Sequence, residues 1–339
     1  MRIRIAVDIM SGDNTPDILI KGAIKAASNF DVDILLVGDE SLKAHIPKNT
    51  VADRIRFVPS YSVIEMDDEP VSVIKEKADS SMAIAASLLK NGEADVLVSA
   101  GNTGALFTAA SLLIRRVKGV RRAALGTVIK LENAFIMLDV GANTDATPDI
   151  LSSFGKMGSL YAKGVLGIEN PRVALLNNGT EQTKGTPLYS EAYSMLMADK
   201  SINFIGNCEG RDLPNNFCDV VVCDGFTGNI ALKLMEGMGA FMSRKIKGVF
   251  YFNLFSKIAG LITKRSTDEL KKQMDHKEYG GAPFLGISKP VIKAHGSSDD
   301  KGIYSAIRQA KLFYNSGIIE KMSSEISNTK SVKECVDER

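Results

Sequence analysis

A single local pattern recurs along this chain and restricts the folds that it can adopt. A short, apolar, β-branched run ends in Gly, Asn, Ser, Thr or Asp, and a helical pattern follows it. Six runs of this kind span residues 3–7, 95–98, 134–138, 173–176, 220–222 and 291–294, and further strands are predicted at 33–38 and 55–59. Apolar strands that alternate with helices predict an α/β fold whose sheet is buried on both faces.

Polar residues follow each of the six runs, and they are candidates for a shared site. In open α/β sheets, ligands bind beyond the carboxyl ends of the strands, so we expect the six clusters to gather along one edge. Glycine lets the backbone approach an anion, and helix N-termini offer free N–H groups. Any one cluster is also explained as a turn that needs glycine for its backbone angles. The candidate substrate-binding residues are Asp8, Gly12, Asp13, Asn14, Asn102, Thr103, Asp139, Asn143, Asn177, Thr180, Asp224, Phe226, Thr227, Lys293, Ser297 and Ser298.

The stretch 280–299 carries the strongest chemical signal. It is predicted to pass from a Gly-Gly-Ala-Pro turn at 280–283 into a strand that ends at His295, and Asp299 is predicted to cap the next helix. An imidazole, the ammonium of Lys293 and a helix N-terminus within a few residues suit an anionic substrate. A histidine after a strand is also a common turn residue, so this stretch needs partners from elsewhere in the chain.

Composition excludes several classes of protein. The chain has 339 residues, with 45% apolar and 24% charged residues, which is typical of a globular protein of one large or two smaller domains. A net charge of +2 and the absence of Trp argue against a nucleic-acid binder. The N-terminus has no signal-peptide pattern and no window is apolar enough to span a membrane, so we expect a cytoplasmic protein that is at most peripheral to the membrane.

Missing motifs narrow the chemistry further. The chain contains no Walker loop, no GxSxG elbow and no HExxH signature. Its four cysteines lack CxxC spacing, and Asp224 beside Cys223 would disfavour a thiolate, so free thiols without a nucleophilic role are expected. Aspartates such as Asp8 and Asp139 could hold Mg²⁺, but carboxylates at strand ends also cap helices. We expect no metal and no cofactor.

The clusters together resemble the bacterial phosphate acyltransferase family. The matching stretches are IAVDIMSGDNTP, VSAGNTGALF, MLDVGANTD, ALLNNGTEQTKG, VVVCDGFTGNIALK and GGAPFLGISKPVIKAHGSSD, which occur in the order typical of the family and cover residues 5–306. One departure is visible: Ser11 stands where the family usually has glycine.

The resemblance implies both a fold and a function. It implies an α/β/α sandwich with a mostly parallel sheet, like that of the isocitrate and isopropylmalate dehydrogenases, with two lobes around a cleft and usually a homodimer. We expect a single two-lobed catalytic domain at residues 1–330, with a basic amphipathic helical insertion at about 237–275 and a polar tail at 331–339. The implied reaction transfers an acyl group from acyl-carrier protein to inorganic phosphate, and the acyl phosphate feeds a membrane glycerol-phosphate acyltransferase in phospholipid synthesis. Alternatives are a phosphotransacetylase-like enzyme that uses coenzyme A, a dehydrogenase relative, and a non-catalytic protein that binds acyl-carrier protein.

The predicted mechanism is direct attack by phosphate, held by neutral donors and lysines, on the thioester carbonyl. His295 is the candidate for proton transfer, Lys184 is its predicted partner across the site, and Asn229 is the third predicted catalytic residue. A solvated loop is the alternative for Lys184. For Lys293, burial beside its strand is an equally good interpretation.

Two surface features suggest partners. Residues 237–267 contain no acidic side chain but carry several basic ones and a dense set of aromatics, including Phe250, Phe252, Phe255 and Lys257. Such a basic amphipathic stretch is typical of a helix that binds a membrane surface or a partner, although it could also pack in the core or in a dimer interface. Arg121 and Arg122 belong to a second basic cluster, which is either a solvated loop or a docking site for an acidic carrier protein.

Overall fold

The computed structural model describes residues 2–46, 52–267 and 280–326. Its strands are β1 (Ile3–Asp8), β2 (Val32–Gly38), β3 (Ile55–Pro59), β4 (Val96–Ser99), β5 (Ala124–Lys130), β6 (Ala134–Leu138), β7 (Arg172–Leu176), β8 (Asn203–Cys208), β9 (Val220–Val222), β10 (Ala282–Leu285) and β11 (Val291–Lys293). Its helices are α1 (Pro16–Asn29), α2 (Ser81–Asn91), α3 (Thr103–Ala109), α4 (Pro148–Gly164), α5 (Pro187–Ala198), α6 (Gly225–Phe250), α7 (Leu254–Ile262) and α9 (Asp300–Asn315). Shorter helical turns span Glu40–His45, Ala52–Arg54, Pro70–Ile74, Ala110–Ile114 and Leu213–Asn215.

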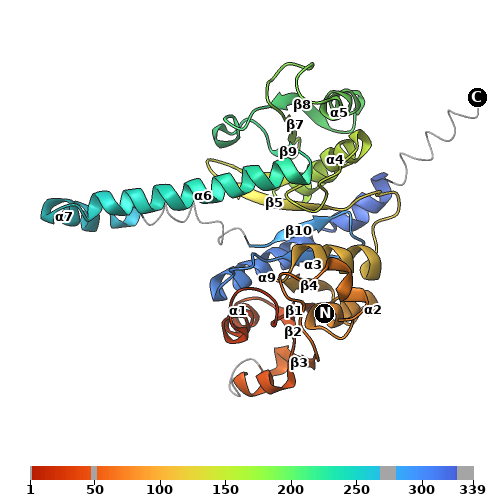
Figure 1. Ribbon diagram of the computed structural model, residues 1–339, viewed down its shortest axis with the longest axis vertical. Helices are drawn as coiled ribbons and strands as arrows, with labels where there is room; N and C mark the ends of the chain where they lie inside the picture. Colours follow the sequence, from red (N-terminus) through yellow and green to blue (C-terminus); the bar gives the residue numbers. More distant parts are fainter. Residues whose placement is uncertain (1, 47–51, 268–279, 327–339) are drawn as a thin grey trace, which may run out of the picture.

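The described strands form one sheet in the order β3-β2-β1-β4-β11-β10-β5-β6-β9-β7-β8. Strands β3, β2, β1, β4 and β11 are parallel to one another, and so are β6, β9, β7 and β8. Between these blocks, β11–β10, β10–β5 and β5–β6 all pair antiparallel. Three successive reversals leave the two parallel blocks running in opposite directions. The sheet is therefore mostly parallel but divided into two halves, which lie one above the other in Figure 1.

Helices cover both faces of the sheet, as the continuous apolar strands predict. One core cluster combines strand residues with side chains from α1, α4, α5 and α9. The other combines the opposite strand face with α2, α3 and the start of α6. Close packing of α4 against the sheet depends on glycine, since a Cβ at Gly158 would lie 2.4 Å from Cγ1 of Val220. The α/β fold with a mostly parallel sheet is confirmed.

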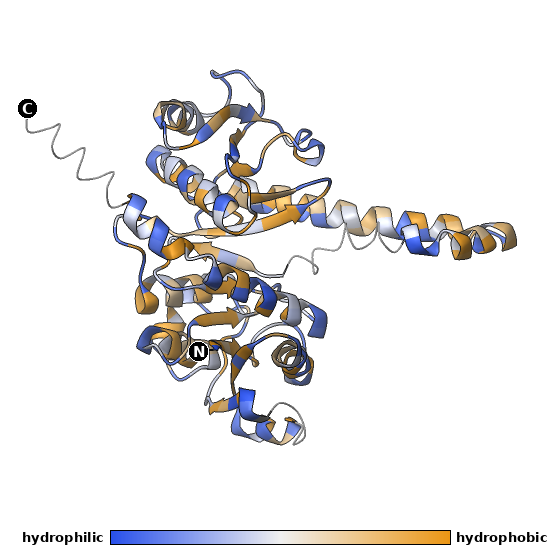
Figure 2. Ribbon diagram, turned by 180° about the vertical axis from the view of Figure 1, so that it is seen from behind, coloured by the Kyte–Doolittle hydropathy of each residue, from blue (hydrophilic) through white to orange (hydrophobic). Residues whose placement is uncertain are grey.

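Helices α6 and α7 form an arm that projects from the body of the protein (Figure 1). Helix α6 begins at Gly225 beside the sheet and continues for 26 residues, about 39 Å at 1.5 Å per residue. Apolar residues are interspersed along the arm and dominate its tip (Figure 2). Phe252 and Phe255 near the tip are 85% and 82% exposed, so they do not pack in the core of this chain. Among the described residues, no helix combines the length and the apolar character that crossing a bilayer would require.

The structure corrects three details of the sequence analysis. The predicted turn at 280–283 is wrong in part, because Ala282 and Pro283 belong to β10 and pair with β11. The basic amphipathic stretch is not one helix, because α6 ends at Phe250 and α7 starts at Leu254. The six polar clusters do not form one row, because the two parallel blocks run in opposite directions. The polar tail predicted at 331–339 lies outside the described residues.

Candidate active site

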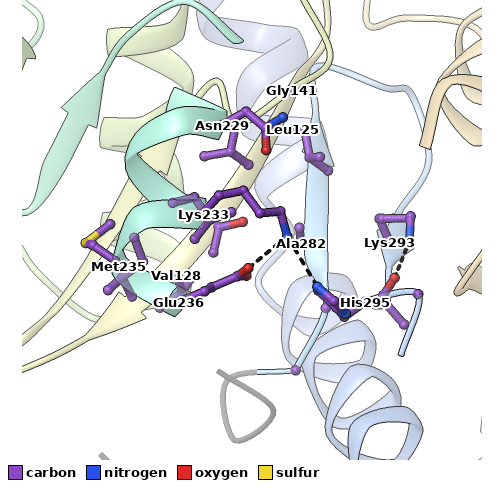
Figure 3. Close-up of a pocket in the computed structure, with 18 of the residues that line it drawn as sticks. Leu125, Val128, Gly141, Asn229, Lys233, Met235, Glu236, Ala282, Lys293 and His295 are labelled. Carbon is purple, nitrogen blue, oxygen red and sulfur yellow. Dashed lines mark hydrogen bonds and ion pairs between the residues drawn. The ribbon is translucent and has the colours of Figure 1, made fainter. Parts of the chain in front are cut away.

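A cavity of about 630 Å³ collects residues from both halves of the sheet. Five of the six polar clusters contribute to its lining: Asp13 follows β1, Thr103 follows β4, Gly141 follows β6, Asn229 follows β9, and the stretch 293–298 includes and follows the end of β11. The remaining cluster, after β7, lies outside this lining. Figure 3 shows α6 on one side of the cavity and β11 with the segment after it on the other. The cavity is therefore the place where polar residues from one half of the sheet meet polar residues from the other half.

The cavity has a polar end and an apolar extension. Lys233, Lys293 and His295 line the polar end, and Figure 3 shows Lys233 reaching from α6 toward His295. The apolar lining comes from β5, from the segments after β5 and β6, and from one face of α6, and it comprises Leu125, Val128, Ile129, Leu131, Val140, Leu232, Met235, Met238 and Met242. Positions 232, 235 and 242 of α6 fall three or seven residues apart and so lie on one side of the helix. This combination suits a ligand with an anionic group at one end and a hydrocarbon chain at the other.

His295 is exposed at the polar end and touches groups from two elements. Its Nδ1 lies 2.9 Å from the Ser297 hydroxyl and 3.2 Å from the Ser297 amide nitrogen, and its Nε2 lies 3.4 Å from Nζ of Lys233. The Lys233 ammonium and the Ser297 amide can only donate, and a neutral imidazole accepts through one nitrogen alone, so the ring cannot accept from both at once. In the tautomer that carries its proton on Nδ1, facing the Ser297 hydroxyl, Nε2 accepts from Lys233 and directs its lone pair toward the cavity.

Lys293 is the last residue of β11 and is only 8% exposed. Its ammonium donates to the backbone oxygens of Ala100, at 3.1 Å, and of Ala294. Burial lowers the pKa of Lys293 to about 8; the nearby positive charge of Lys233 acts in the same direction, whereas Asp13 and Asp8 oppose it. Burial and contact with the cavity therefore both hold for this lysine, although the sequence analysis treated them as alternatives.

The loops after β1 and β11 are tied together. The Asp13 amide donates to the Gly296 oxygen at 2.9 Å, and the Asn14 side chain donates to the Ser298 oxygen at 3.0 Å. Gly12 has φ of +119°, and a Cβ there would lie 3.1 Å from the Gly296 oxygen. A side chain at this position would be strained, so glycine is required for the approach of the two loops. At Ser11, where the family usually has glycine, the hydroxyl is buried and makes no hydrogen bond among the described residues.

Asp224 fixes the start of α6. Its carboxylate accepts hydrogen bonds from the amides of Phe226 and Thr227, from the Thr227 hydroxyl and from the Tyr189 hydroxyl. Burial alone would raise the pKa of Asp224, but these donors lower it below its usual value. The same burial and the neighbouring carboxylate raise the pKa of Tyr189. This cap sets the direction in which Asn229, slightly more than one turn later, faces the cavity.

Asp139 and Asn143 organise the loop after β6. Asp139 is buried and accepts from four backbone amides, of Leu125, Gly141, Ala142 and Asn143, and from the Asn143 side chain. Burial raises its pKa, while these donors oppose that shift. The Asn143 oxygen in turn accepts from the Gly225 amide at 2.7 Å, which links this loop to α6. Both residues act through backbone structure rather than by facing the cavity.

Several other predicted residues lie outside the cavity lining. Asp8 is buried and accepts from the hydroxyls of Ser81 and Ser99 at 2.7 Å each. Asn102 caps α3. The remaining predicted residues of this group are exposed or half-buried: Phe226, Thr227, Asn177, Thr180 and Ser297, of which Ser297 contacts His295.

Lys184 lies on the exposed loop after β7 and does not meet His295. Its ammonium is 4.0 Å from Glu181, and its backbone oxygen accepts from the Asn177 side chain at 3.0 Å. The cation that the structure places beside His295 is Lys233, which the sequence analysis did not single out. It is four residues after Asn229 on α6, and that spacing places both on one side of the helix. Glu236, its ion-pair partner at 2.8 Å, was missed as well.

The remaining predicted features are on the surface or in the core. Arg121 pairs with Asp149 at 2.5 Å and Arg122 is exposed. Phe252, Phe255 and Lys257 are exposed on the arm, and Phe250 is half-buried. Cys208, Cys218 and Cys223 are buried free thiols, and burial raises the pKa of Cys223, which leaves it unsuited to act as a nucleophile.

The fold is shared with phosphotransacetylases of known structure. A phosphotransacetylase from Streptococcus pyogenes aligns with a TM-score of 0.64 over 93% of this chain and 94% of its own, at 16% identity. A Salmonella typhimurium protein described as a 4-hydroxythreonine-4-phosphate dehydrogenase aligns with a TM-score of 0.52 over 92% and 99%, at 14% identity. At such low identity the likeness establishes architecture alone. It defines an α/β protein of the phosphotransacetylase type, which dehydrogenases share.

Sequence comparison identifies the family. Residues 3–321 match the family model described as a fatty acid synthesis protein. A relative from Desulfitobacterium hafniense named phosphate acyltransferase is 44% identical over 335 residues, which are 98% of this chain and 100% of the relative. The chain therefore belongs to the bacterial phosphate acyltransferase family. It is an acyltransferase that uses phosphate as the acyl acceptor.

Proposed function

We propose that this protein transfers a fatty acyl group from acyl-carrier protein to inorganic phosphate and so supplies acyl phosphate for phospholipid synthesis. The observation that carries the proposal is a single cavity with lysines and His295 at one end and an apolar extension along β5 and α6. Phosphate needs the first and a fatty acyl chain needs the second. Membership of the phosphate acyltransferase family supports the same reaction.

In the proposed reaction, a phosphate oxygen attacks the thioester carbonyl carbon. A carbon–oxygen bond forms, the carbon–sulfur bond breaks, and the carrier thiolate leaves. His295 accepts a proton from phosphate through Nε2 and returns it to the thiolate, so the free thiol and the acyl phosphate are the only products. The thioester is already activated, so the main task of the protein is to align the two reactants and to stabilise the oxyanion. In this proposal the Asn229 side chain, which lies beside Gly141 in the lining, donates to that oxyanion.

The hydrocarbon chain of the donor occupies the apolar extension in this proposal. Leu125 and Ile129 of β5 face the same core cluster as Leu232 and Met235 of α6. Methionine side chains adapt to ligands of varied shape, so this wall suits a flexible chain. Burying each methylene contributes about 0.8 kcal/mol, which is enough to hold the donor while the reaction occurs at the polar end.

Basic surfaces support an acidic carrier protein as the donor. The arm carries Arg244, Lys245 and Lys247 on α6, and Arg122 is exposed near the start of β5. Acyl-carrier proteins are acidic, and charge complementarity of this kind speeds encounter and sets orientation. Coenzyme A is the alternative donor.

The arm supports two further proposals, contact with a membrane and pairing of two copies. Its tip exposes Phe252 and Phe255 with no acidic residue nearby in sequence, which suits an anionic lipid surface. Along α6, Ile230, Leu234 and Phe241 are exposed in a stripe. Gly237 lies in the same stripe, and a Cβ at this position would meet nothing within 4 Å. Packing within this chain therefore does not require glycine here. A second α6 packed on this stripe would use the apolar residues and the small glycine together.

The test of the function uses the purified full-length protein with acyl-carrier protein thioester and phosphate. The expected result is release of the carrier thiol that depends on phosphate, together with transfer of radiolabelled phosphate into an organic-soluble product. Thiol release that proceeds equally without phosphate would refute the proposal. Release from acyl-coenzyme A alone would change the donor but keep the reaction. A protein residue that becomes acylated in the absence of phosphate would exclude direct attack.

A further inference from the structure

The pair formed by Lys233 and Glu236 is not accounted for by the packing of the fold. Lys233 projects from α6 across the cavity, with its ammonium 2.8 Å from the Glu236 carboxylate and 3.4 Å from Nε2 of His295 (Figure 3). The Lys233 side chain is 55% exposed, whereas that of Glu236 is 18% exposed. Both line the cavity. An ion pair that serves only the helix would have no need to face the reacting groups.

The two lysines at the polar end differ in how firmly their ammonium groups are held by hydrogen bonds. The Lys293 ammonium is buried and bonded to two backbone oxygens. Lys233 is held by one carboxylate on its own helix, three residues away, and its long side chain reaches into open space. More than half of the Lys233 side chain is exposed, which weakens the ion pair, so a stronger anion can replace Glu236. Lys233 can therefore follow an incoming anion, whereas Lys293 stays in place.

The charges of the cavity favour an anion between these lysines. Burial is the main cause of the lowered pKa of Lys293, and the positive charge of Lys233 adds to it, so the two ammonium groups repel each other. An anion that bridges them would relieve that repulsion. Asp13 and Glu236 also line this end, so the anion must compete with two carboxylates. A phosphate with two negative charges competes better than a monoanion.

We propose that Lys233 is the cation that receives the phosphate substrate, and that Glu236 is its counter-ion only until phosphate enters. As Lys233 turns to the phosphate, its hydrogen bond to His295 breaks, and Nε2 becomes available to accept the phosphate proton. Binding of the nucleophile and activation of the base are thus coupled through one side chain. The inference rests on the proposed function, because it takes phosphate as the nucleophile and His295 as the base.

The experiment compares four variants of the full-length protein: Lys233→Ala, Lys233→Arg, Glu236→Gln and Lys163→Ala. Lys163 is an exposed lysine on α4 outside the cavity, so its variant controls for a general loss of positive charge. The dissociation constant of inorganic phosphate is measured by calorimetry without any acyl donor. The KM for phosphate and the KM for the acyl donor are then measured by thiol release. Thermal unfolding of each variant checks that it is folded.

Lys233→Ala should raise the dissociation constant and the KM for phosphate about 10- to 150-fold, the range for losing a charged hydrogen bond, with the KM for the donor unchanged. Lys233→Arg should restore most of the phosphate affinity, because it keeps the charge. Glu236→Gln should tighten phosphate binding, because it removes the competing carboxylate. A purely structural ion pair predicts the opposite: both Lys233→Ala and Glu236→Gln would lose stability and activity together. That outcome, or an unchanged phosphate constant in Lys233→Ala, overturns the inference.

Failure of the inference and failure of the proposed function give different results. If phosphate binding depends on Lys233 but no carrier thiol is released, the donor or the reaction is wrong and the role of Lys233 stands. If thiol release depends on phosphate with normal constants in Lys233→Ala, the reaction stands and the role of Lys233 is refuted.

Discussion

Replacing Lys293 with Met should stabilise the protein while removing its activity. Burial lowers the pKa of Lys293 from 10.5 to about 8 in the folded protein. At about 1.4 kcal/mol per pH unit, that fall corresponds to a cost of about 3 kcal/mol for keeping the buried ammonium charged. The backbone oxygens of Ala100 and Ala294 accept from the ammonium, so about 3 kcal/mol is an upper limit. Methionine has a similar volume and no charge to desolvate.

The dependence on pH gives the sharpest form of this prediction. Below about pH 8 both the folded and the unfolded wild-type protein carry the proton on Lys293, and the full cost applies. Between about 8 and 10.5 only the unfolded chain holds the proton, so the free energy of unfolding of the wild type rises with pH. The Met variant lacks this rise. Its advantage of up to about 3 kcal/mol at pH 7 should therefore shrink to less than about 1 kcal/mol by about pH 10.

The assay is urea unfolding at pH 7 and at pH 10, followed by circular dichroism and by tyrosine fluorescence, since the chain has no Trp. Lys289→Met is the matched control, because Lys289 is half-buried and also donates to two backbone oxygens, of Leu89 and Lys90. A difference between wild type and Lys293→Met that stays constant from pH 7 to pH 10 would refute the reasoning. So would a variant that is less stable at pH 7.

Three further predictions follow from the cavity and the arm. Asn229→Ala should lower kcat about 10²- to 10³-fold, as expected for an oxyanion donor, without changing the thermal midpoint, since the side chain is exposed; steady-state kinetics with unchanged kcat would contradict this role. Met235→Phe should shift the preferred donor toward shorter acyl chains, by about fourfold in kcat/KM per methylene lost, whereas Met197→Phe on the exposed face of α5 should leave the chain-length profile as in the wild type. Phe252→Glu should abolish flotation with anionic vesicles, and Tyr61→Glu, an equally exposed aromatic on the body, should not; wild-type protein that stays at the bottom of the gradient would remove the membrane proposal.

Local patterns in the sequence predict the strands well because burial on both faces leaves a continuous apolar run. The predicted strands at 134–138 and 220–222 coincide with β6 and β9, which are almost entirely buried. Strand β10 was read as a turn because its Pro283 lacks the N–H that a central strand normally needs. Pro283 pairs with Ile292 on one side only, and the pairs with β5 begin at Phe284, so the missing donor is tolerated. Such tolerance depends on long-range pairing and has no local signal.

The position of Lys184 shows why a site is harder to predict than a fold. The motif that contains Lys184 follows β7, and five strand spacings, roughly 24 Å along the sheet, separate β7 from β11. Strand order is set by pairings between distant segments, so nothing near Lys184 in the sequence reports this separation. Lys233 was visible as the residue four positions after Asn229, but only the path of α6 across the cavity brings it to His295. The polar clusters predict which residues matter, and the topology decides which of them meet.

Helix α6 runs without a break from the polar end of the cavity toward the exposed tip of the arm, so the positions of the two are linked. The Asp224 cap fixes its first turn, Asn229 and Lys233 face the polar end, and Met235 and Met242 belong to the apolar wall. Beyond them the helix leads to the exposed tip at Phe252. Because a helix is stiff over this length, the tip and the site keep a fixed relative orientation. An acyl chain that entered along the apolar wall from the tip would go in with its methyl end first. Its thioester would then remain near the tip, far from the polar end of the cavity. In the proposed reaction the thioester lies beside His295, so we predict that the carrier end of the donor docks near the segment after β11. The basic residues of the arm, Arg244, Lys245 and Lys247, would then steer its approach rather than hold it.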